Sequence, residues 1–231
     1  MSKAVAIVSG GLDSTVLAYF LKSAGYDVHM VSFDYGQRHR RELAYADITA
    51  RKLQVKHDVV DLRGIMRFIN GSSLTNPAIP VPDGWYTEES MKITVVPNRN
   101  MIMLAIAGGI AVNENAEVVA TAVHTGDHFI YPDCRPPFVK HLNDALRAGN
   151  EGFGNPALAI YAPFLHDSKA EIVRIGQELK VPFADTWSCY KGAEMHCGKC
   201  GTCNERKEAF ALANVPDPTR YEYEGPYVPN K

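Results

Sequence analysis

The first half of the chain alternates short apolar runs with longer segments of mixed polarity. Residues 4–8, 28–33 and 58–62 are short and rich in β-branched side chains, which is typical of buried strands. The segments between them, residues 13–24 and 42–53, have the length of helices. Strands that alternate with helices predict a doubly wound α/β fold, in which a mostly parallel sheet carries helices on both faces.

The second half continues the pattern with longer interruptions. Residues 70–92 contain several prolines and predict a long irregular loop, and such loops are often functional. Beyond this loop we expect helices at 100–113, 138–147, 168–179 and 204–214, and strands at 117–123 and 158–164. We expect two parts: an α/β domain over residues 1–185, and a small cysteine-containing segment with the C-terminal tail over residues 186–231.

Composition and charge exclude several classes of protein. The chain has 231 residues and a net charge of -2, which provides no overall field for non-specific nucleic-acid binding. A local basic patch at residues 38–41 is possible, but a solvated helix surface is favoured. The longest apolar run, residues 101–112, is shorter than the about 20 residues that cross a bilayer. With no secretory signal, we expect a cytoplasmic protein without membrane or direct nucleic-acid partners.

The turn after the first strand has the sequence Ser9-Gly10-Gly11-Leu12-Asp13-Ser14. Two glycines allow a tight turn and a close approach to a ligand, and the amides at the start of the following helix favour an anion. Asp13 is an N-cap, a magnesium ligand or a residue that orients the loop. An ordinary glycine turn is the alternative. The candidate nucleotide-binding residues are Val8, Ser9, Gly10, Gly11, Leu12, Asp13, Ser14, Thr15, Val16, Leu17 and Ala18.

This turn is not a P-loop, because it lacks the closing Gly-Lys-Ser/Thr. Cationic help for phosphates must therefore come from elsewhere in the chain. The candidates are Lys169, Arg99 and the basic run at 38–41.

Four of the five cysteines, Cys189, Cys197, Cys200 and Cys203, lie close together in the sequence. In a reducing compartment this spacing predicts a closed, structural metal site, and zinc is favoured over an iron–sulfur cluster. His196 is an alternative ligand, although a solvent-facing position is favoured for it.

Three polar runs follow predicted elements and offer groups for a planar, polar substrate. The first contains Phe33, Tyr35, Gln37 and Arg38, which could stack on a heterocycle and hydrogen-bond its edge. The second is Asn98-Arg99-Asn100, and the third extends from Gly126 to Arg135 and contains Asp127 and Asp133. Carboxylates pair with N–H donors, so these two aspartates are candidates for the amine edge of a base.

The Ser-Gly-Gly-x-Asp-Ser turn after a first strand resembles the loop of the ATP-pyrophosphatase (adenine nucleotide α-hydrolase-like) superfamily. Members of that superfamily cleave ATP between the α- and β-phosphates and activate an acid as an adenylate. Residues 1–185 would then form the nucleotide-binding domain. An enzyme of this superfamily with another acceptor, a tRNA base or a protein, is the nearest alternative. A zinc-ribbon module that binds nucleic acid, and a nucleotide sensor without turnover, are more distant ones.

The full set of motifs is similar to the 7-cyano-7-deazaguanine synthase family of queuosine precursor biosynthesis. The set comprises the glycine turn, Phe33-Asp-Tyr-Gly-Gln-Arg-His39, Asn98-Arg-Asn100, Tyr131-Pro-Asp-Cys-Arg135 and the four cysteines. The resemblance implies an ATP-dependent ligase that converts 7-carboxy-7-deazaguanine and ammonia into the 7-cyano base through adenylate and amide intermediates. It also implies structural zinc, ATP as substrate with Mg²⁺, and a homodimer. Ser14, Lys169 and Arg99 would then be the catalytic residues around the phosphates.

Overall fold

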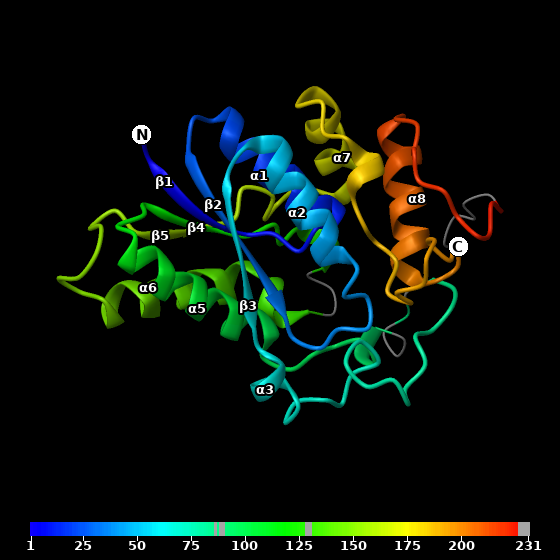
Figure 1. Ribbon diagram of the computed structural model, residues 1–231, viewed down its shortest axis with the longest axis horizontal. Helices are drawn as coiled ribbons and strands as arrows, with labels where there is room; N and C mark the ends of the chain where they lie inside the picture. The colour runs from blue at the N-terminus through cyan, green and yellow to red at the C-terminus, as the bar shows by residue number, and fades with distance from the viewer. Residues whose placement is uncertain (86, 88–90, 128–130, 226–231) are drawn as a thin grey trace.

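The computed structural model describes residues 1–85, 87, 91–127 and 131–225 (Figure 1). These residues contain one parallel sheet with the strand order β3-β2-β1-β4-β5. Its strands are β1 (Lys3–Ile7), β2 (Asp27–Asp34), β3 (Lys56–Asp61), β4 (Val118–Ala120) and β5 (Ala159–Tyr161). The order confirms the predicted doubly wound α/β fold. The direction of winding reverses between β1 and β4, and in such sheets ligands bind outside the carboxyl ends of the strands at that point.

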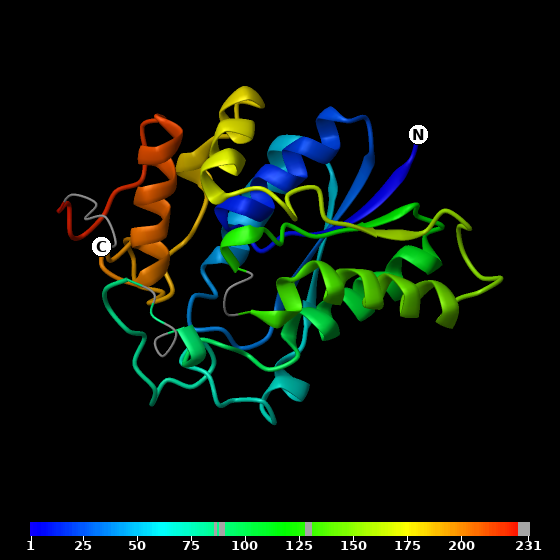
Figure 2. The same cartoon turned by 180° about the vertical axis from the view of Figure 1, so that it is seen from behind.

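Helices cover both faces of the sheet. On one face lie α1 (Leu12–Ser23), α2 (Glu42–Leu53) and α7 (Lys169–Glu178), and α8 (Gly201–Ala213) packs against α7 (Figure 1). On the other face lie α5 (Arg99–Asn113) and α6 (Pro136–Gly149), which the reverse view shows in front (Figure 2). The short helix α3 (Arg63–Met66) follows β3.

Each face buries its own apolar core. The core beneath α1 and α7 includes Val16 and Ile172, both 0% exposed. The core beneath α5 includes Leu104 and Val119. The helices approach closely, because a Cβ atom on Gly108 of α5 would lie 2.5 Å from a methyl carbon of Leu146 on α6. Burial of apolar area on both faces fixes the sheet and therefore the positions of the loops at its edge.

Two strands are shorter than the sequence predicts. The predicted strands 117–123 and 158–164 pair only over Val118–Ala120 and Ala159–Tyr161. The Thr121 amide still donates to the Tyr161 carbonyl at 3.0 Å, and the next residues line a cavity instead of continuing the ladder. Apolar composition cannot separate residues that pair in a sheet from residues that line a cavity beside it.

Two further differences concern helix starts and short helices. The helix predicted for 138–147 begins at Pro136, where two successive prolines occupy its first turn. The helix α3 (Arg63–Met66) is not predicted, because a single turn carries too little periodicity. Within residues 70–85 the loop is irregular, as expected.

The C-terminal segment adds a third, smaller apolar cluster. Trp187 and Tyr221 pack there around the four clustered cysteines. A backbone hydrogen bond of 2.9 Å from the Trp187 amide to the Gly10 carbonyl ties this segment to the turn after β1. The boundary at residue 185 stays a prediction. Among the described helices, none combines the length and apolar character needed to cross a bilayer.

Candidate active site

A cavity of about 240 Å³ lies at the carboxyl ends of the central strands. Val8 lines it beyond β1, Ser32 and Phe33 line it from β2, and residues 121–123 line it beyond β4. The cavity therefore sits at the point where the winding of the sheet reverses, which is the position that the fold predicts for a ligand.

The turn after β1 forms one wall of this cavity. The Oγ atoms of Ser9 and Ser14 lie 3.2 Å apart, and the Gly11 amide donates to Ser9 Oγ at 3.2 Å. Gly11 is the N-cap of α1 and makes no side-chain capping bond. The first amides of α1 are thus not covered by a capping side chain, and together with the helix dipole they favour an anion.

The two glycines of the turn have different roles. Gly10 has a φ of +90°, and a Cβ atom there would lie 2.1 Å from the Glu42 carbonyl oxygen. Only glycine fits this contact between the turn and α2. Gly11 has an ordinary φ of -72° and lines the cavity. The sequence predicts that the backbone of both glycines approaches a ligand closely. In the structure the Gly10 backbone instead approaches α2, and only Gly11 borders the cavity.

An ion-pair cluster lies beside the turn. Lys169, the first residue of α7, places Nζ 2.7 Å from Glu205 Oε2 and 3.3 Å from Asp13 Oδ2. His124 Nε2 lies 3.8 Å from the same Asp13 oxygen. Asp13 is in the first turn of α1 and is not its N-cap, so that interpretation of Asp13 is wrong. Its Oδ1 is buried without a hydrogen-bond partner among the described residues, and a cation or a donor from a ligand would complete it.

Another part of the cavity lining is aromatic and contains a guanidinium. Arg99, the first residue of α5, donates to the Tyr35 hydroxyl at 3.5 Å, and Tyr131 and Tyr190 line the same region. No carboxylate of the described residues lies within 4.0 Å of Arg99. Burial raises the pKa of Tyr35 to about 12, although Arg99 opposes the shift. Arg99 therefore offers its charge to an anion that enters the cavity.

The cavity residue Glu42 is absent from the predicted site, and His39 is predicted only as a member of the basic run 38–41 and of the motif 33–39. Glu42 starts α2 and is 7% exposed; its Oε1 accepts from Gln37 Nε2 at 3.1 Å and lies 3.5 Å from His39 Nε2. Burial raises the pKa of Glu42 to about 8, and burial with the Arg99 charge lowers that of His39 to about 3. Both side chains are therefore mainly uncharged near neutral pH. The only sequence feature that could have indicated this pair is a His and a Glu three residues apart, shortly after the end of the second strand.

Other cavity residues also escape prediction. They come from the C-terminal segment, including α8. The sequence analysis assigns this segment to a metal site, and no motif links its residues to the glycine turn. The residues of this group are Trp187, Ser188, Tyr190, Thr202 and Glu205.

The structure brings most of the predicted nucleotide and catalytic residues together. Ser14, Lys169 and Arg99 all line the cavity, as do Phe33 and Tyr35. Of the predicted loop residues, Val8, Ser9, Gly11, Leu12, Asp13 and Ser14 line it. The last four, Thr15, Val16, Leu17 and Ala18, are 0% exposed and face the interior of the fold.

Other predicted substrate residues lie elsewhere. Gln37 braces the turn after β2 by donating to the Phe33 carbonyl at 3.0 Å, and Arg38 donates to the Asn76 and Ile79 carbonyls, so neither lines the cavity. Asp133 Oδ2 accepts a hydrogen bond from the backbone N–H of Asn100 at 3.4 Å, at the start of α5. The side chain of Asp127 lies outside the described part of the chain.

The four clustered cysteines form a second site. Their Sγ atoms all lie within 4.8 Å of one another, and each residue is buried. The recorded Sγ–Sγ distances are 3.9 Å for Cys197–Cys203, 3.5 Å for Cys200–Cys203 and 4.0 Å for Cys189–Cys200. Four sulfurs at about 2.3 Å from one tetrahedral ion are separated by about 3.8 Å. The cluster could therefore hold a single metal ion.

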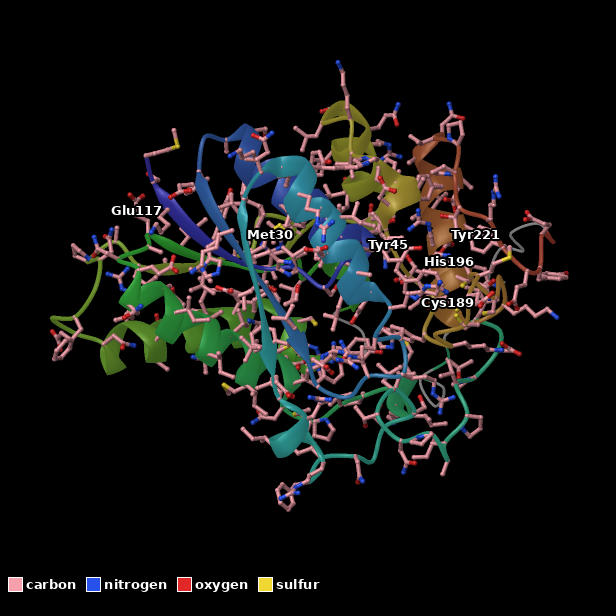
Figure 3. All side chains as sticks on the ribbon, viewed as in Figure 1. Met30, Tyr45, Glu117, Cys189, His196 and Tyr221 are labelled. Atoms are coloured by element: carbon pink, nitrogen blue, oxygen red, sulfur yellow. The ribbon has the colours of Figure 1, made fainter. Side chains whose placement is uncertain are left out.

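His196 is not a solvent-facing residue, and that expectation is wrong. It is 6% exposed, its ring lies 4.2 Å from the Trp187 ring, and its Nε2 accepts from the Ser188 amide at 3.0 Å. Figure 3 shows His196 between Tyr221 and Cys189, beside α8. His196 therefore supports the chain around the cysteines, and the backbone bond occupies its Nε2.

The cysteine site and the cavity share the helix α8. Cys200 is the N-cap of α8, and its Sγ lies 3.3 Å from Thr202 Oγ1. Thr202 and Glu205, which lie near the start of α8, line the cavity. Arg206 is fully buried and donates to Ser188 Oγ at 3.1 Å. A metal at the cysteines would thus fix the helix that positions Glu205 against Lys169.

Comparison with known proteins identifies relatives along almost the whole chain. The 7-cyano-7-deazaguanine synthase of Paracoccus denitrificans is 54% identical over 220 residues, which cover 95% of this chain and 93% of the relative. The protein of the same name from Ruegeria pomeroyi is 54% identical over 219 residues, covering 95% of this chain and 94% of the relative. That from Brucella ovis is 51% identical over 220 residues, covering 95% and 94%.

Among solved structures, NMN synthetase from Francisella tularensis shares the fold, with a TM-score of 0.52 at 13% identity over 92% of this chain and 77% of that chain. The family model described as "Queuosine biosynthesis protein QueC" matches residues 3–214. With this match and relatives more than 50% identical along its length, the chain belongs to the QueC family of queuosine biosynthesis proteins.

Proposed function

We propose that this protein is a 7-cyano-7-deazaguanine synthase, an ATP-dependent ligase that converts 7-carboxy-7-deazaguanine and ammonia into the 7-cyano base. Relatives that align with 95% of the chain carry that name. The observation that supports the proposal most directly is that one cavity is lined both by an anion-favouring helix start and by Arg99 among tyrosines. The reaction needs such a pair of sites, one for a triphosphate and one for a planar acid.

The phosphate end would hold ATP against the turn after β1. The amides at the start of α1 and the hydroxyls of Ser9 and Ser14 would donate to phosphate oxygens. Lys169 would exchange part of its contact with Asp13 for the charge that develops on departing pyrophosphate. The buried Oδ1 of Asp13 is an oxygen of the kind that Mg²⁺ prefers, and we infer that Mg²⁺ accompanies ATP there.

The aromatic end would hold the acceptor. Tyr35 and Phe33 line this region and offer ring faces for a deazapurine. Arg99, which has no carboxylate partner within the described chain, would bind the 7-carboxylate and direct it towards the α-phosphate. This role replaces phosphate neutralisation as our interpretation of Arg99, because its contacts are with Tyr35 and not with the turn.

Two rounds of activation account for the product. In the first, a carboxylate oxygen attacks the α-phosphorus of ATP, pyrophosphate leaves, and ammonia then replaces AMP to give an amide. In the second, the amide oxygen is adenylated and departs with AMP while the nitrogen loses two protons, which leaves a nitrile. Lys169 and the helix start would stabilise the phosphate charge in both rounds.

We also propose that the four cysteines hold zinc. All four are buried, and their spacing matches one tetrahedral ion ligated by thiolates. A four-iron cluster would separate the sulfurs further than the recorded distances. Because every position of the tetrahedron is taken by a cysteine, the ion would stabilise the segment around α8 and take no part in the chemistry. Metal analysis of the purified protein tests the identity of the ion.

The function is tested by mass spectrometry of the products formed from ATP, ammonium and 7-carboxy-7-deazaguanine. We expect the nitrile, with two AMP released for each nitrile formed. Release of AMP that is independent of the deazaguanine acid, or no nitrile, would overturn the proposal. The homodimer implied by the family resemblance is a separate proposal, and sedimentation of the protein at micromolar concentration tests it.

A further inference from the structure

The cavity also contains a buried acid–imidazole pair that the steps above do not use. Glu42 is 7% exposed and His39 is 3% exposed, yet both line the cavity. The recorded contacts of Glu42 with Gln37 and His39 use only Oε1. His39 Nδ1 is buried and has no hydrogen-bond partner among the described residues. A buried polar atom without a partner is costly, so a ligand that donates hydrogen bonds would stabilise this corner.

The neighbours of the pair indicate which ligand fits. Arg99 lies close enough to both Glu42 and His39 to affect their electrostatics, and it contacts the Tyr35 hydroxyl. If Arg99 holds the acceptor's carboxylate, the carbon that ammonia attacks lies beside Glu42 and His39. In neutral water ammonia is mainly ammonium, a small cation with four N–H donors and no lone pair. A carboxyl oxygen and a free imidazole nitrogen are acceptors for such a cation.

We propose that Glu42 and His39 form the ammonium site and that Glu42 accepts the proton that turns ammonium into the nucleophile. This inference rests on the proposed function and names the place of its third substrate. Ammonium would donate to the Glu42 carboxylate and to His39 Nδ1, while Gln37 holds Glu42 Oε1 in place. Gln37 thus has a positioning role, which explains why it is buried behind the cavity and does not line it.

The protons and electrons of the step balance as follows. Ammonium gives one proton to the Glu42 carboxylate and becomes ammonia. The lone pair of ammonia forms the C–N bond, and the C–O bond to AMP breaks with its electron pair leaving on AMP. The nitrogen then loses a second proton to the departing phosphate oxygen, which gives the amide.

The surroundings of Glu42 suit this transfer. Burial favours the protonated form of Glu42, which makes its carboxylate a stronger base than an exposed one, while the Gln37 hydrogen bond and the Arg99 charge work in the other direction. Without bound ammonium, Glu42 is mainly protonated; the positive charge of bound ammonium favours its carboxylate form, and this carboxylate then accepts the proton. After transfer, both ammonia and Glu42 are neutral, which is the state that a buried site favours.

The test compares nucleophiles in the variant Glu42→Gln, with the full chain and its bound metal. Hydroxylamine is mainly neutral at pH 7 and needs no base, so it reports the adenylate without the proton transfer. We expect ammonium-dependent amide formation to fall about 100-fold, while hydroxamate formation with hydroxylamine stays within about threefold of wild type. We expect Glu42→Asp to recover part of the ammonium activity, and His39→Asn to raise the KM for ammonium about tenfold with little change in that for ATP.

Acceptor-dependent exchange of pyrophosphate into ATP, measured without ammonium, reports adenylation alone. Wild type without this exchange would contradict the proposed function, whereas exchange retained in Glu42→Gln with lost amide formation supports the ammonium site. Equal losses with both nucleophiles, or a raised KM for the acceptor with an unchanged KM for ammonium, would overturn it. The matched control is Asp47→Asn, on the same helix, where the carboxylate pairs with Arg51 at the surface; it should behave as wild type.

Discussion

The two ends of the cavity hold their charges in different ways. At the phosphate end, Lys169 lies between Asp13 and Glu205, so its charge is compensated before any ligand arrives. At the acceptor end, Arg99 contacts the Tyr35 hydroxyl, and the nearby Glu42 and His39 are mainly neutral near pH 7. If ATP binds as proposed, the first end has to rearrange its ion pairs, whereas the second presents the uncompensated charge of Arg99 to the acceptor.

This difference has a physical origin in what supports each end. Lys169 and Glu205 belong to α7 and α8, and the N-cap of α8 is Cys200 of the four-cysteine cluster. Arg99 and Glu42 are the first residues of α5 and α2, which pack directly on opposite faces of the sheet. The Lys169–Glu205 pair therefore depends on the C-terminal segment through α8, whereas the positions of Arg99 and Glu42 depend on helices that pack on the main cores. Four predictions test this separation, from the largest expected effect to the smallest.

Loss of the metal should have the largest effect, and it should act on the phosphate end. In Cys200→Ser, or after chelation, we expect α8 to lose its fixed start and the protein to lose on the order of 5 kcal/mol of stability, part of the apparent binding energy of a structural zinc site. Thermal unfolding together with metal content measures this. Cys134→Ser, outside the cluster, should keep its metal. An unchanged melting temperature after complete metal removal would show that the cluster does not support the fold.

Replacement of the lysine at the phosphate end comes next. In Lys169→Met we expect acceptor-dependent pyrophosphate exchange to fall about 100- to 1,000-fold, because an electrostatic contact to the reacting phosphates is lost. The exchange assay with labelled pyrophosphate measures it. Lys140→Met, at an exposed ion pair on α6, serves as the control. Wild-type exchange in Lys169→Met would remove this residue from the site.

Replacement of the Arg99 guanidinium at the acceptor end should affect the KM for the acceptor. In Arg99→Gln we expect the KM for 7-carboxy-7-deazaguanine to rise about 10- to 100-fold, since a charge-assisted hydrogen bond is worth about 1.5–3 kcal/mol. The KM for ATP should change by less than about threefold. Steady-state kinetics with each substrate varied in turn measures both. An equal rise in both KM values would mean that the two ends are not separate.

The smallest effect, taken per pH unit, concerns stability and its dependence on pH. The pKa of Glu42 in the folded protein is raised to about 8 from an ordinary value of 4.5, so the folded state holds a proton that the unfolded chain releases between these values. This contribution to stability is fully present below about pH 4.5 and is lost as the pH rises towards 8.

The variant Glu42→Gln keeps a neutral side chain at every pH. We therefore expect its melting temperature to equal that of wild type below about pH 4.5 and to exceed it by the equivalent of about 1.4 kcal/mol for each pH unit between there and pH 8. Calorimetry at pH values across this range measures the difference. A constant difference across this range would mean that Glu42 titrates normally in the folded protein.

The sequence predicts the parts of this protein that depend on local pattern. Alternating apolar and amphipathic segments predict the parallel sheet and most helices, because burial on both faces requires that pattern. The Gly10-Gly11 turn and the four cysteines are equally local, since the groups that act together lie within a few residues of one another. The lengths of β4 and β5 are not predicted, because residues that pair and residues that line the cavity have the same apolar character.

The sequence by itself determined the order of the elements, the glycine turn before α1 and the spacing of the cysteines. Only the tertiary structure brought Lys169 to Asp13, placed Glu205 of α8 beside them, and set Glu42 and His39 into the cavity lining with Arg99. Lys169, Asp13 and Glu205 are far apart in the chain, and their distances follow from the packing of α1, α7 and α8 on one another. Charge pairing and burial are properties of that packing, so no local pattern could have shown which of these groups meet a ligand as ions and which as neutral acids and bases.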